Sequence, residues 1–264
     1  MTITIQEAID TIISAVPGAP FPETVDTIKI GDPAQPLTGI LLTFLATAEV
    51  IEQAVQLGAN LIIAHEPTFY NHPDATAWLA GNTVYTAKRQ LLERHRLVIW
   101  RFHDYLHAIP PDGTIMGLLK ALGWETYTLP DQLWVCQIPP MTLRDIALKV
   151  KERLGPGILR VVGDLESTCQ TVGLLPGFPG GEWQISALDQ QPGVEVLITG
   201  EIHEWETSEY VRDAIRLGHQ KGLIVIGHAA SEEPGMKWIV SWLQECLPNV
   251  PIHFVPTGSP FQQL

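Results

Sequence analysis

Residues 60–67 read NLIIAHEP, a short apolar run that ends abruptly in a histidine and a glutamate. A run of about four to eight apolar residues is typical of a strand that is buried on both faces of a sheet. A helical pattern at residues 46–57 precedes this run, and a second helical pattern separates it from a similar run, LVIWRF, at residues 97–102. Strands that alternate with helices in this way predict parallel pairing through right-handed crossovers.

The same alternation extends over most of the chain. We expect strands at residues 39–45, 60–64, 97–102, 133–138, 158–162, 169–175, 194–199, 223–226 and 252–255. We expect helices at residues 5–16, 46–57, 76–96, 116–122, 143–154, 183–189, 204–217 and 232–247. The predicted fold class is therefore α/β, with two units of mainly parallel or mixed sheets flanked by helices.

A change of composition near the middle of the chain suggests a domain boundary. Residues 124–131 are rich in aromatic residues, threonine and proline, and a second series of strands and helices begins after them. We place the first unit at residues 1–126 together with about 220–264, so that C-terminal strands complete its sheet. The second unit then covers residues 127–219.

Charge and composition argue against several classes of protein. The chain of 264 residues has a formal net charge of −13, which disfavours nucleic acid and anionic membranes as partners but allows a local pocket for a small phosphate ester. It has no apolar run of about 18 residues and no basic leader, so we expect no membrane span and a cytoplasmic location. Cys136, Cys169 and Cys246 lie far apart in the sequence, which predicts free thiols.

Polar side chains gather directly after four of the predicted strands. They are His65 and Glu66; His103, Asp104 and His107; Glu201; and His228 and Glu232. Open α/β sheets bind ligands at the carboxyl ends of their strands, and parallel pairing brings those ends to one edge. Imidazoles with carboxylates suit Zn²⁺, Mn²⁺, Fe²⁺ or Co²⁺ better than Mg²⁺. The coincidence of four such clusters therefore predicts a site for a divalent metal ion.

Each cluster taken alone also has a simpler structural explanation. Glu232 is compatible with a favourable interaction at the N-terminus of the helix expected there, for which Ser231 is a suitable N-cap. Each histidine is compatible with a hydrogen-bonded core residue or a loop residue. Glu66 is compatible with an exposed loop carboxylate, and Glu201 with a cap on the helix that follows it.

Other catalytic motifs are absent from the sequence. It contains no G-x-S-x-G nucleophile elbow and no P-loop. The Gly/Pro segment PGFPGG at residues 176–181 lacks the pattern G-x-G-x-x-G. The strand-end clusters are therefore the main signal for chemistry.

Four segments of the chain, in order, resemble the motifs of one protein family. LIIAHEPTFY (61–70) resembles a strand followed by His-His-Pro, and RFHDYLHA (101–108) resembles a His-x-x-x-Asp segment. VEVLITGEIHEWETSEYVRDA (194–214) resembles an Asp-x-x-x-Thr-Gly-Glu strand with its helix. GHAASEEPGMKWIVSWL (227–243) resembles the most specific motif, Gly-His-x-x-x-Glu. The chain thus resembles the NGG-interacting-factor-three-like family, also labelled GTP cyclohydrolase 1 type 2 or dinuclear metal centre proteins.

The resemblance implies five metal ligands, namely His65, Glu66, His107, His228 and Glu232. Glu66 stands where the family has a second histidine, and His107 stands where it has an aspartate, so three imidazoles and two carboxylates are retained. An imidazole has one lone pair and cannot bridge two ions as a carboxylate can. The exchange therefore leaves open whether one or two ions bind per chain. His103, with Asp104 beside it, matches another family histidine and is expected to support a ligand or to contact the substrate.

The resemblance also implies an assembly and an activity. The expected assembly is a homohexameric ring with the metal sites facing an interior cavity. The expected activity is hydrolysis by a metal-activated water, with Glu201 as general acid or base and with GTP, another nucleotide or a phosphoester as substrate. Two alternatives stay open: a phosphoesterase, and a metal-binding scaffold or regulatory protein without turnover. An open coordination position distinguishes a catalytic metal site from a structural one.

Overall fold

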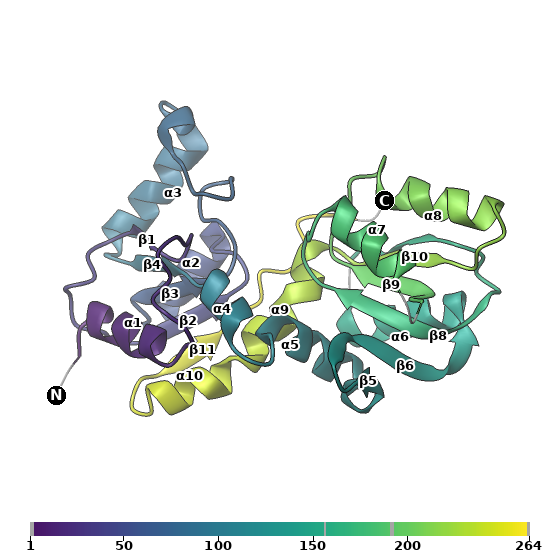
Figure 1. The fold of residues 1–264 in the computed structure, drawn as a ribbon. Helices are drawn as coiled ribbons and strands as arrows, with labels where there is room; N and C mark the ends of the chain where they lie inside the picture. Colours follow the sequence, from purple (N-terminus) through teal and green to yellow (C-terminus); the bar gives the residue numbers. More distant parts are fainter. Residues whose placement is uncertain (1–2, 156, 191–192, 263–264) are drawn as a thin grey trace. The chain divides into compact units, whose positions relative to one another are not determined.

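The apolar runs form two separate sheets, one in each of two units of the chain (Figure 1). The computed structural model describes residues 3–155, 157–190 and 193–262. Unit 1 comprises Met1–Gly113 and Met236–Thr257, and unit 2 comprises Thr114–Gly235 and Gly258–Leu264. Each unit combines one sheet with flanking helices, so the predicted α/β class is confirmed.

Unit 1 is built on a five-stranded sheet in the order β1-β4-β3-β2-β11. The strands are β1 (Ile28–Ile30), β2 (Ile40–Thr43), β3 (Leu61–Ala64), β4 (Val98–Arg101) and β11 (Ile252–Phe254). β4, β3, β2 and β11 are parallel, and β1 pairs antiparallel with β4 at the edge. Every residue of β2, β3 and β4 is buried, which explains why these strands are apolar almost throughout instead of alternating.

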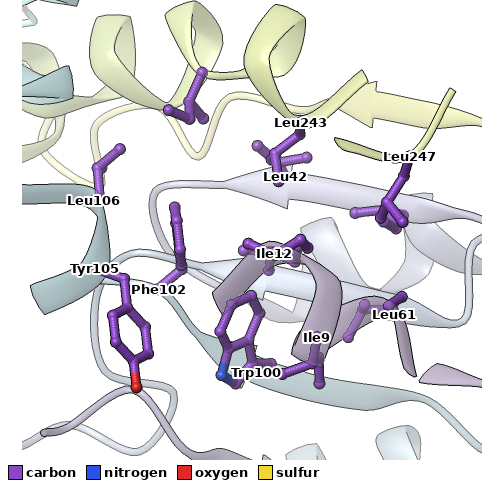
Figure 2. Packing of buried hydrophobic residues seen from close by; sticks show 14 of the residues in the cluster. Ile9, Ile12, Leu42, Leu61, Trp100, Phe102, Tyr105, Leu106, Leu243 and Leu247 are labelled. Atoms are coloured by element: carbon purple, nitrogen blue, oxygen red, sulfur yellow. The ribbon is translucent and has the colours of Figure 1, made fainter. Parts of the chain in front are cut away.

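Helices cover both faces of this sheet. They are α1 (Ile5–Ser14), α2 (Ala48–Gln56), α3 (Thr83–Arg94), α4 (Asp104–Ala108) and α10 (Val240–Cys246), with a 3-10 turn, η1, at Ala77–Leu79. α1 and α10 pack on one face with Leu42, Leu61 and Trp100 (Figure 2). α2 and α3 pack on the other face with Leu41 and Ile62. The sheet is thus covered on both sides, as parallel sheets generally are.

Unit 2 contains a mixed six-stranded sheet in the order β5-β6-β8-β9-β10-β7. The strands are β5 (Thr128–Leu129), β6 (Gln132–Thr142), β7 (Arg160–Val162), β8 (Thr168–Leu175), β9 (Val196–Thr199) and β10 (Gly222–Val225). β8, β9 and β10 are parallel, whereas the other three pairings are antiparallel. The parallel strands include β9, which is followed by Glu201, and its neighbour β10, which is followed by His228.

The helices of unit 2 also cover both faces of their sheet. They are α5 (Gly113–Leu122), α6 (Leu143–Leu154), α7 (Gly181–Asp189) and α8 (Thr207–Arg216), with a 3-10 turn, η2, at Glu125–Tyr127. α9 (His228–Trp238) follows β10, and its last residues from Met236 on belong to unit 1. α5 and α6 share a core with Val172 and Ile198. α7 and α8 share another with Leu197 and Leu223. None of the helices in the described ranges is long and apolar enough to cross a membrane.

Local capping signals determine several helix ends. In α1, Thr4 and Glu7 form a capping box: the Glu7 N–H donates to Thr4 Oγ1 at 3.1 Å, and the Thr4 N–H donates to Glu7 Oε2 at 2.7 Å. Thr142 caps α6 by accepting the Asp145 N–H at 3.1 Å. Gly155, with φ of 58°, ends the same helix in the left-handed conformation.

Two predicted helices are divided in the structure. The helix expected at residues 76–96 begins only at Thr83, because Gly81 has φ of 79° and Asn82 caps α3 by accepting the Tyr85 N–H. The helix expected at residues 232–247 is also divided, into α9 and α10. α9 already begins at His228, so the prediction of Ser231 as its N-cap was wrong.

The division of the chain differs from the expected boundaries near residues 126 and 220. The structure divides after Gly113 and Gly235. α5 belongs to unit 2 because Leu118 and Leu122 lie in the core of that unit. β10 belongs there because it pairs with β9, so β11 alone among the C-terminal strands completes the sheet of unit 1. β1 was not expected, since Lys29 interrupts its apolar residues and leaves no apolar run.

Replacing Leu42 by alanine should lower the free energy of unfolding of unit 1 by about 2–5 kcal/mol. Leu42 is 0% exposed, so the truncation leaves a cavity between the sheet and the helices that cover it. Urea denaturation followed by circular dichroism measures the loss. Leu57→Ala is the matched control, because Leu57 is 44% exposed and should change the unfolding free energy by less than about 0.5 kcal/mol. Equal losses for the two variants would contradict the assignment of Leu42 to the core.

Candidate metal centre

Three histidines of unit 1, His65, His103 and His107, form what we call the histidine cluster. β3 and β4 are neighbouring parallel strands, so the segments that follow them, with His65 and His103, leave the sheet side by side. His107 lies one turn further along α4, where its N–H donates to the His103 carbonyl at 3.1 Å. The ring centroids lie 4.7 Å apart for His65 and His103, 5.3 Å for His65 and His107, and 4.9 Å for His103 and His107.

Hydrogen bonds at Nδ1 orient all three rings. The acceptors are the Phe102 carbonyl at 3.1 Å for His65, Asp104 Oδ1 at 2.8 Å for His103, and Asp112 Oδ2 at 2.9 Å for His107. In a neutral imidazole that donates from Nδ1, the lone pair is on Nε2. One ring nitrogen from each histidine lies within 4.8 Å of the other two, so the three residues are placed to share an ion.

The surroundings of His103 keep its imidazole neutral. Burial and the neighbouring His65 lower the pKa of His103 to about 3, although its hydrogen bond to Asp104 opposes this shift. Burial of Asp104 raises the pKa of that carboxyl, but hydrogen bonds from His103, Thr24 and the Val25 N–H outweigh it and lower the pKa to about 2. At neutral pH a neutral imidazole therefore donates to an ionised carboxylate, the arrangement in which histidine binds metals.

Asp26 holds the start of α4 in place. Its Oδ1 accepts the His103 N–H at 2.7 Å and its Oδ2 accepts the Tyr105 N–H at 2.8 Å. The Asp26 carboxyl is almost fully buried, and this burial raises its pKa. The backbone that carries His103 is thus bound to a segment far away in the sequence.

Glu66 lies beside the histidine cluster and pairs with a buried arginine. Arg101 Nη2 is 3.5 Å from Glu66 Oε2, and the Arg101 side chain is 1% exposed. The guanidinium also donates to the His65 carbonyl at 3.1 Å and to the His72 carbonyl, and it lies 4.0 Å from Asp74 Oδ2. The second oxygen of Glu66, Oε1, is 3.7 Å from His103 Nε2.

Unit 2 contains a second set, Glu201, His228 and Glu232, which we call the carboxylate–histidine cluster. β9 and β10 are neighbouring parallel strands, which brings Glu201 and His228 together: His228 Nδ1 is 3.5 Å from Glu201 Oε2. Glu232 lies one turn along α9, and its Oε2 is 3.1 Å from His228 Nε2. The hydrogen bond from His228 lowers the pKa of Glu201, so this carboxyl is ionised at neutral pH.

A glycine is needed next to this second cluster. A Cβ on Gly177, where φ is +68°, would lie 2.2 Å from Glu232 Oε1. The Gly177 N–H donates to Ser231 Oγ at 2.9 Å, and that hydroxyl donates to the His228 carbonyl at 2.7 Å. Ser231 therefore joins the loop after β8 to the first turn of α9 and fixes the spacing of His228 and Glu232.

The structure thus divides the predicted site residues between the two units. His65, Glu66, His103, Asp104 and His107 lie together in unit 1, and Glu201, His228 and Glu232 lie together in unit 2. The convergence of all five carried-over ligands on the same ions stays a prediction. Within each unit, however, the strand-end argument correctly places the polar side chains of neighbouring strands next to one another.

Three residues that the sequence analysis did not identify support the histidine cluster. Arg101 was detectable in principle, since a charged residue interrupts the apolar run LVIWRF. Asp112 lies five residues after His107, and this spacing only weakly indicates a contact between them. Asp26 lies in a segment without a recognisable pattern, so only the structure reveals its contacts with α4.

The donors of unit 1 fit a divalent transition-metal ion. Neutral imidazoles bind Zn²⁺ and Fe²⁺ well and are poor ligands for Mg²⁺ and Ca²⁺. Metal-binding histidines usually donate their other ring N–H to a carboxylate or a carbonyl, and all three histidines of the cluster do so.

The stability of the metal-free protein should decrease as the pH falls below about 6.5. Unfolded His103 takes up a proton with the ordinary pKa of 6.5, whereas folded His103 does so only near a pKa of about 3, so acid favours the unfolded chain. His103→Asn keeps a donor for Asp104 but does not titrate, and it should flatten the pH dependence. Melting temperatures between pH 7 and pH 4, measured in EDTA, test this. Exposed His219, replaced by asparagine, is the control and should keep the wild-type profile.

Comparisons with known proteins agree with this architecture. Among solved structures, the chain is similar to the Staphylococcus aureus hypothetical protein SA1388, with a TM-score of 0.80 and 22% identity over 100% of both chains. It is also similar to a Bacillus cereus protein related to NIF3, with a TM-score of 0.77 and 19% identity over 100% of both chains. These likenesses show that the fold is shared.

Curated relatives show a similarity of sequence over most of the chain. A GTP cyclohydrolase 1 type 2 homolog of Clostridium perfringens is 26% identical over 217 residues, which are 78% of this chain and 78% of that protein. A protein of the same name from Nostoc is 27% identical over 230 residues, which are 82% of this chain and 80% of that protein. The family model Duf34/NIF3 (NGG1p interacting factor 3) matches residues 6–260, and the chain therefore belongs to this family.

Proposed function

We propose that this protein is a metal-dependent hydrolase that acts on a nucleotide or another small phosphoester through a metal-activated water. The observation that carries the proposal is the histidine cluster, in which three imidazoles are oriented by hydrogen bonds at Nδ1. The carboxylate–histidine cluster supports it with an ionised Glu201 beside His228. The name of the relatives, GTP cyclohydrolase 1 type 2 homolog, agrees with a nucleotide substrate.

Each unit has its own set of proposed ligands. His65 and His107 are the proposed ligands from unit 1, with Glu66 as a further candidate beside them. His228 and Glu232 are the proposed ligands from unit 2, and their one-turn spacing on α9 places both side chains on the same face of that helix. The support for this set is the donor chemistry of each cluster together with the match to the family motifs.

Glu201 is the proposed general acid and base. A divalent metal ion lowers the pKa of a bound water toward about 7 and so supplies hydroxide at neutral pH. Glu201 is ionised at that pH, and its side chain is 55% exposed, so water and substrate have access to it. His228 Nδ1 lies 3.5 Å from Glu201 Oε2 and holds that oxygen in position. A proton accepted at Glu201 can then be donated to the leaving group.

Replacing both His228 and Glu232 by alanine should weaken Zn²⁺ binding by more than about 100-fold, because the centre loses two donors. Equilibrium dialysis with elemental analysis measures the affinity and the number of ions per chain. The control pair is His219→Ala with Glu204→Ala, two exposed residues outside both clusters. If the folded double variant keeps the wild-type affinity, the ligands from unit 2 are wrongly assigned.

Glu201→Gln should keep the metal content and lower turnover by about 10²–10⁴-fold, because glutamine cannot accept a proton. The dependence of kcat on pH should also lose the limb that belongs to this carboxylate. Glu204→Gln is the control, since Glu204 is 75% exposed and pairs with Arg160 on the surface. A Glu201→Gln variant with the kcat and pH profile of the wild type would remove Glu201 from the mechanism.

The hydrolase proposal itself is tested with the full chain loaded with Zn²⁺, Mn²⁺, Fe²⁺ or Co²⁺. GTP, other nucleotides, phosphomonoesters and phosphodiesters are offered in turn, and product formation is followed by chromatography. Turnover that depends on the metal and on Glu201 supports the proposal. Full metal occupancy without turnover of any of these substrate classes would favour a metal-binding scaffold instead.

A further inference from the structure

We propose that His103 is a metal ligand in this chain and that it takes the place which the family pattern assigns to Glu66. Unit 1 then contributes three imidazoles, from His65, His103 and His107, and no carboxylate. The proposal rests on the metal-binding part of the proposed function and not on hydrolysis. It differs from the expectation that His103 only supports a ligand or contacts the substrate.

The three rings share one hydrogen-bonding pattern at Nδ1, although the acceptor is a carbonyl for His65 and a carboxylate for His103 and His107. Each Nδ1 donates to an oxygen, so that each imidazole directs the lone pair of Nε2 away from its acceptor. His103 does not differ from His65 or His107 in this respect. One ring nitrogen of each histidine lies within 4.8 Å of the other two, which makes the three a set of candidate donors inside one unit.

Hydrogen bonds hold His103 both at its ring and at its backbone. Its Nδ1 acceptor, Asp104, is itself fixed at Oδ2 by Thr24 Oγ1 at 2.8 Å and by the Val25 N–H at 3.1 Å. Its backbone N–H is fixed by Asp26. Such support around a ligand fixes the tautomer and the direction of the ring, as is usual for metal-binding histidines.

Glu66 is bound in a different way. Its Oε2 lies 3.5 Å from a guanidinium that is almost fully buried and that is held by the carbonyls of His65 and His72. A carboxylate that shares its charge with arginine is a weaker donor to a metal ion. Glu66 Oε1 is 3.7 Å from His103 Nε2, which is too long for a hydrogen bond. Glu66 Oε2 is therefore paired with Arg101, whereas His103 belongs to the histidine cluster.

This assignment has a consequence for the choice of metal. Three imidazoles favour Zn²⁺, Fe²⁺ or Co²⁺ over Mn²⁺ and Mg²⁺, which prefer oxygen ligands. None of the three can bridge two ions, because each offers one lone pair. The ligands of unit 1 are thus those of a nitrogen-rich, borderline-soft site.

The test counts the imidazoles around the metal in the full-length chain. Wild type, His103→Asn, His103→Ala and Glu66→Gln are loaded with Zn²⁺ and studied by X-ray absorption at the zinc edge. Co²⁺ titrations followed by visible absorption give the affinities. His103→Asn preserves a donor to Asp104, and circular dichroism verifies that each variant is folded. His72→Ala is the control, because the His72 ring is 5.4 Å from that of His103 but His72 is not one of the three proposed ligands.

The expected result is one imidazole fewer per ion in both His103 variants, with an affinity at least about tenfold lower. Glu66→Gln and His72→Ala should keep the wild-type imidazole count. The proposal is overturned if the His103 variants keep the full count, or if Glu66→Gln changes the oxygen ligands of the ion. Hydrolysis is not measured here, so an inactive protein that binds zinc through His103 refutes only the proposed function. A wild-type chain that binds neither Zn²⁺ nor Co²⁺ refutes this proposal directly.

Discussion

The parallel pairing of β3 with β4 is the constraint on which the histidine cluster depends. Ala64 and Arg101 are partners at the ends of these strands, so the segments that follow leave the sheet side by side. Both strands are buried on both faces, so a shift of their register would be costly because it would disrupt the packing of their side chains in both cores. The short helix α4 then adds His107 one turn after His103.

Parallel pairing of adjacent strands also positions the polar cluster of unit 2. β9 and β10 are parallel neighbours, and the segments that follow them bring Glu201 to His228. Each unit therefore builds its polar cluster from a pair of adjacent strands followed by a helical turn. In both cases the sheet supplies the rigid frame, and the first turn of a helix supplies the residue at i+4.

Much of the fold was predictable because buried parallel strands leave a strong signal. The runs that became β3 and β4 were located to within a residue or so, and the helix Leu143–Leu154 was predicted with its observed bounds. Periodicity carries no information on which sheet a strand joins. The run that became β10 was therefore assigned to the wrong sheet, although its polar end was correctly identified.

The candidate site was predictable only where it follows a strand. His65, His103, Glu201 and His228 satisfy that condition, and neighbours in the sequence extended the set. Arg101 and Asp26 support the histidine cluster through hydrogen bonds with residues far away in the sequence, and no local pattern predicts such contacts. Ser231 shows that a local pattern can also mislead. Its residue type suits an N-cap, but it lies inside α9, where its hydroxyl accepts a hydrogen bond from the Gly177 N–H.

Asp26 gives the histidine cluster an unexpected link to the beginning of the chain. The carboxylate lies in the segment between α1 and β1, and it is hydrogen-bonded to the first turn of α4. Any ion held by His103 therefore stabilises the docking of that segment, since binding favours the folded state that carries the site. Reciprocally, detachment of the segment that carries Asp26 would break the hydrogen bond that Asp26 accepts from the His103 N–H. With His103 as the proposed ligand, metal affinity would also report whether the segment around Asp26 is docked on α4.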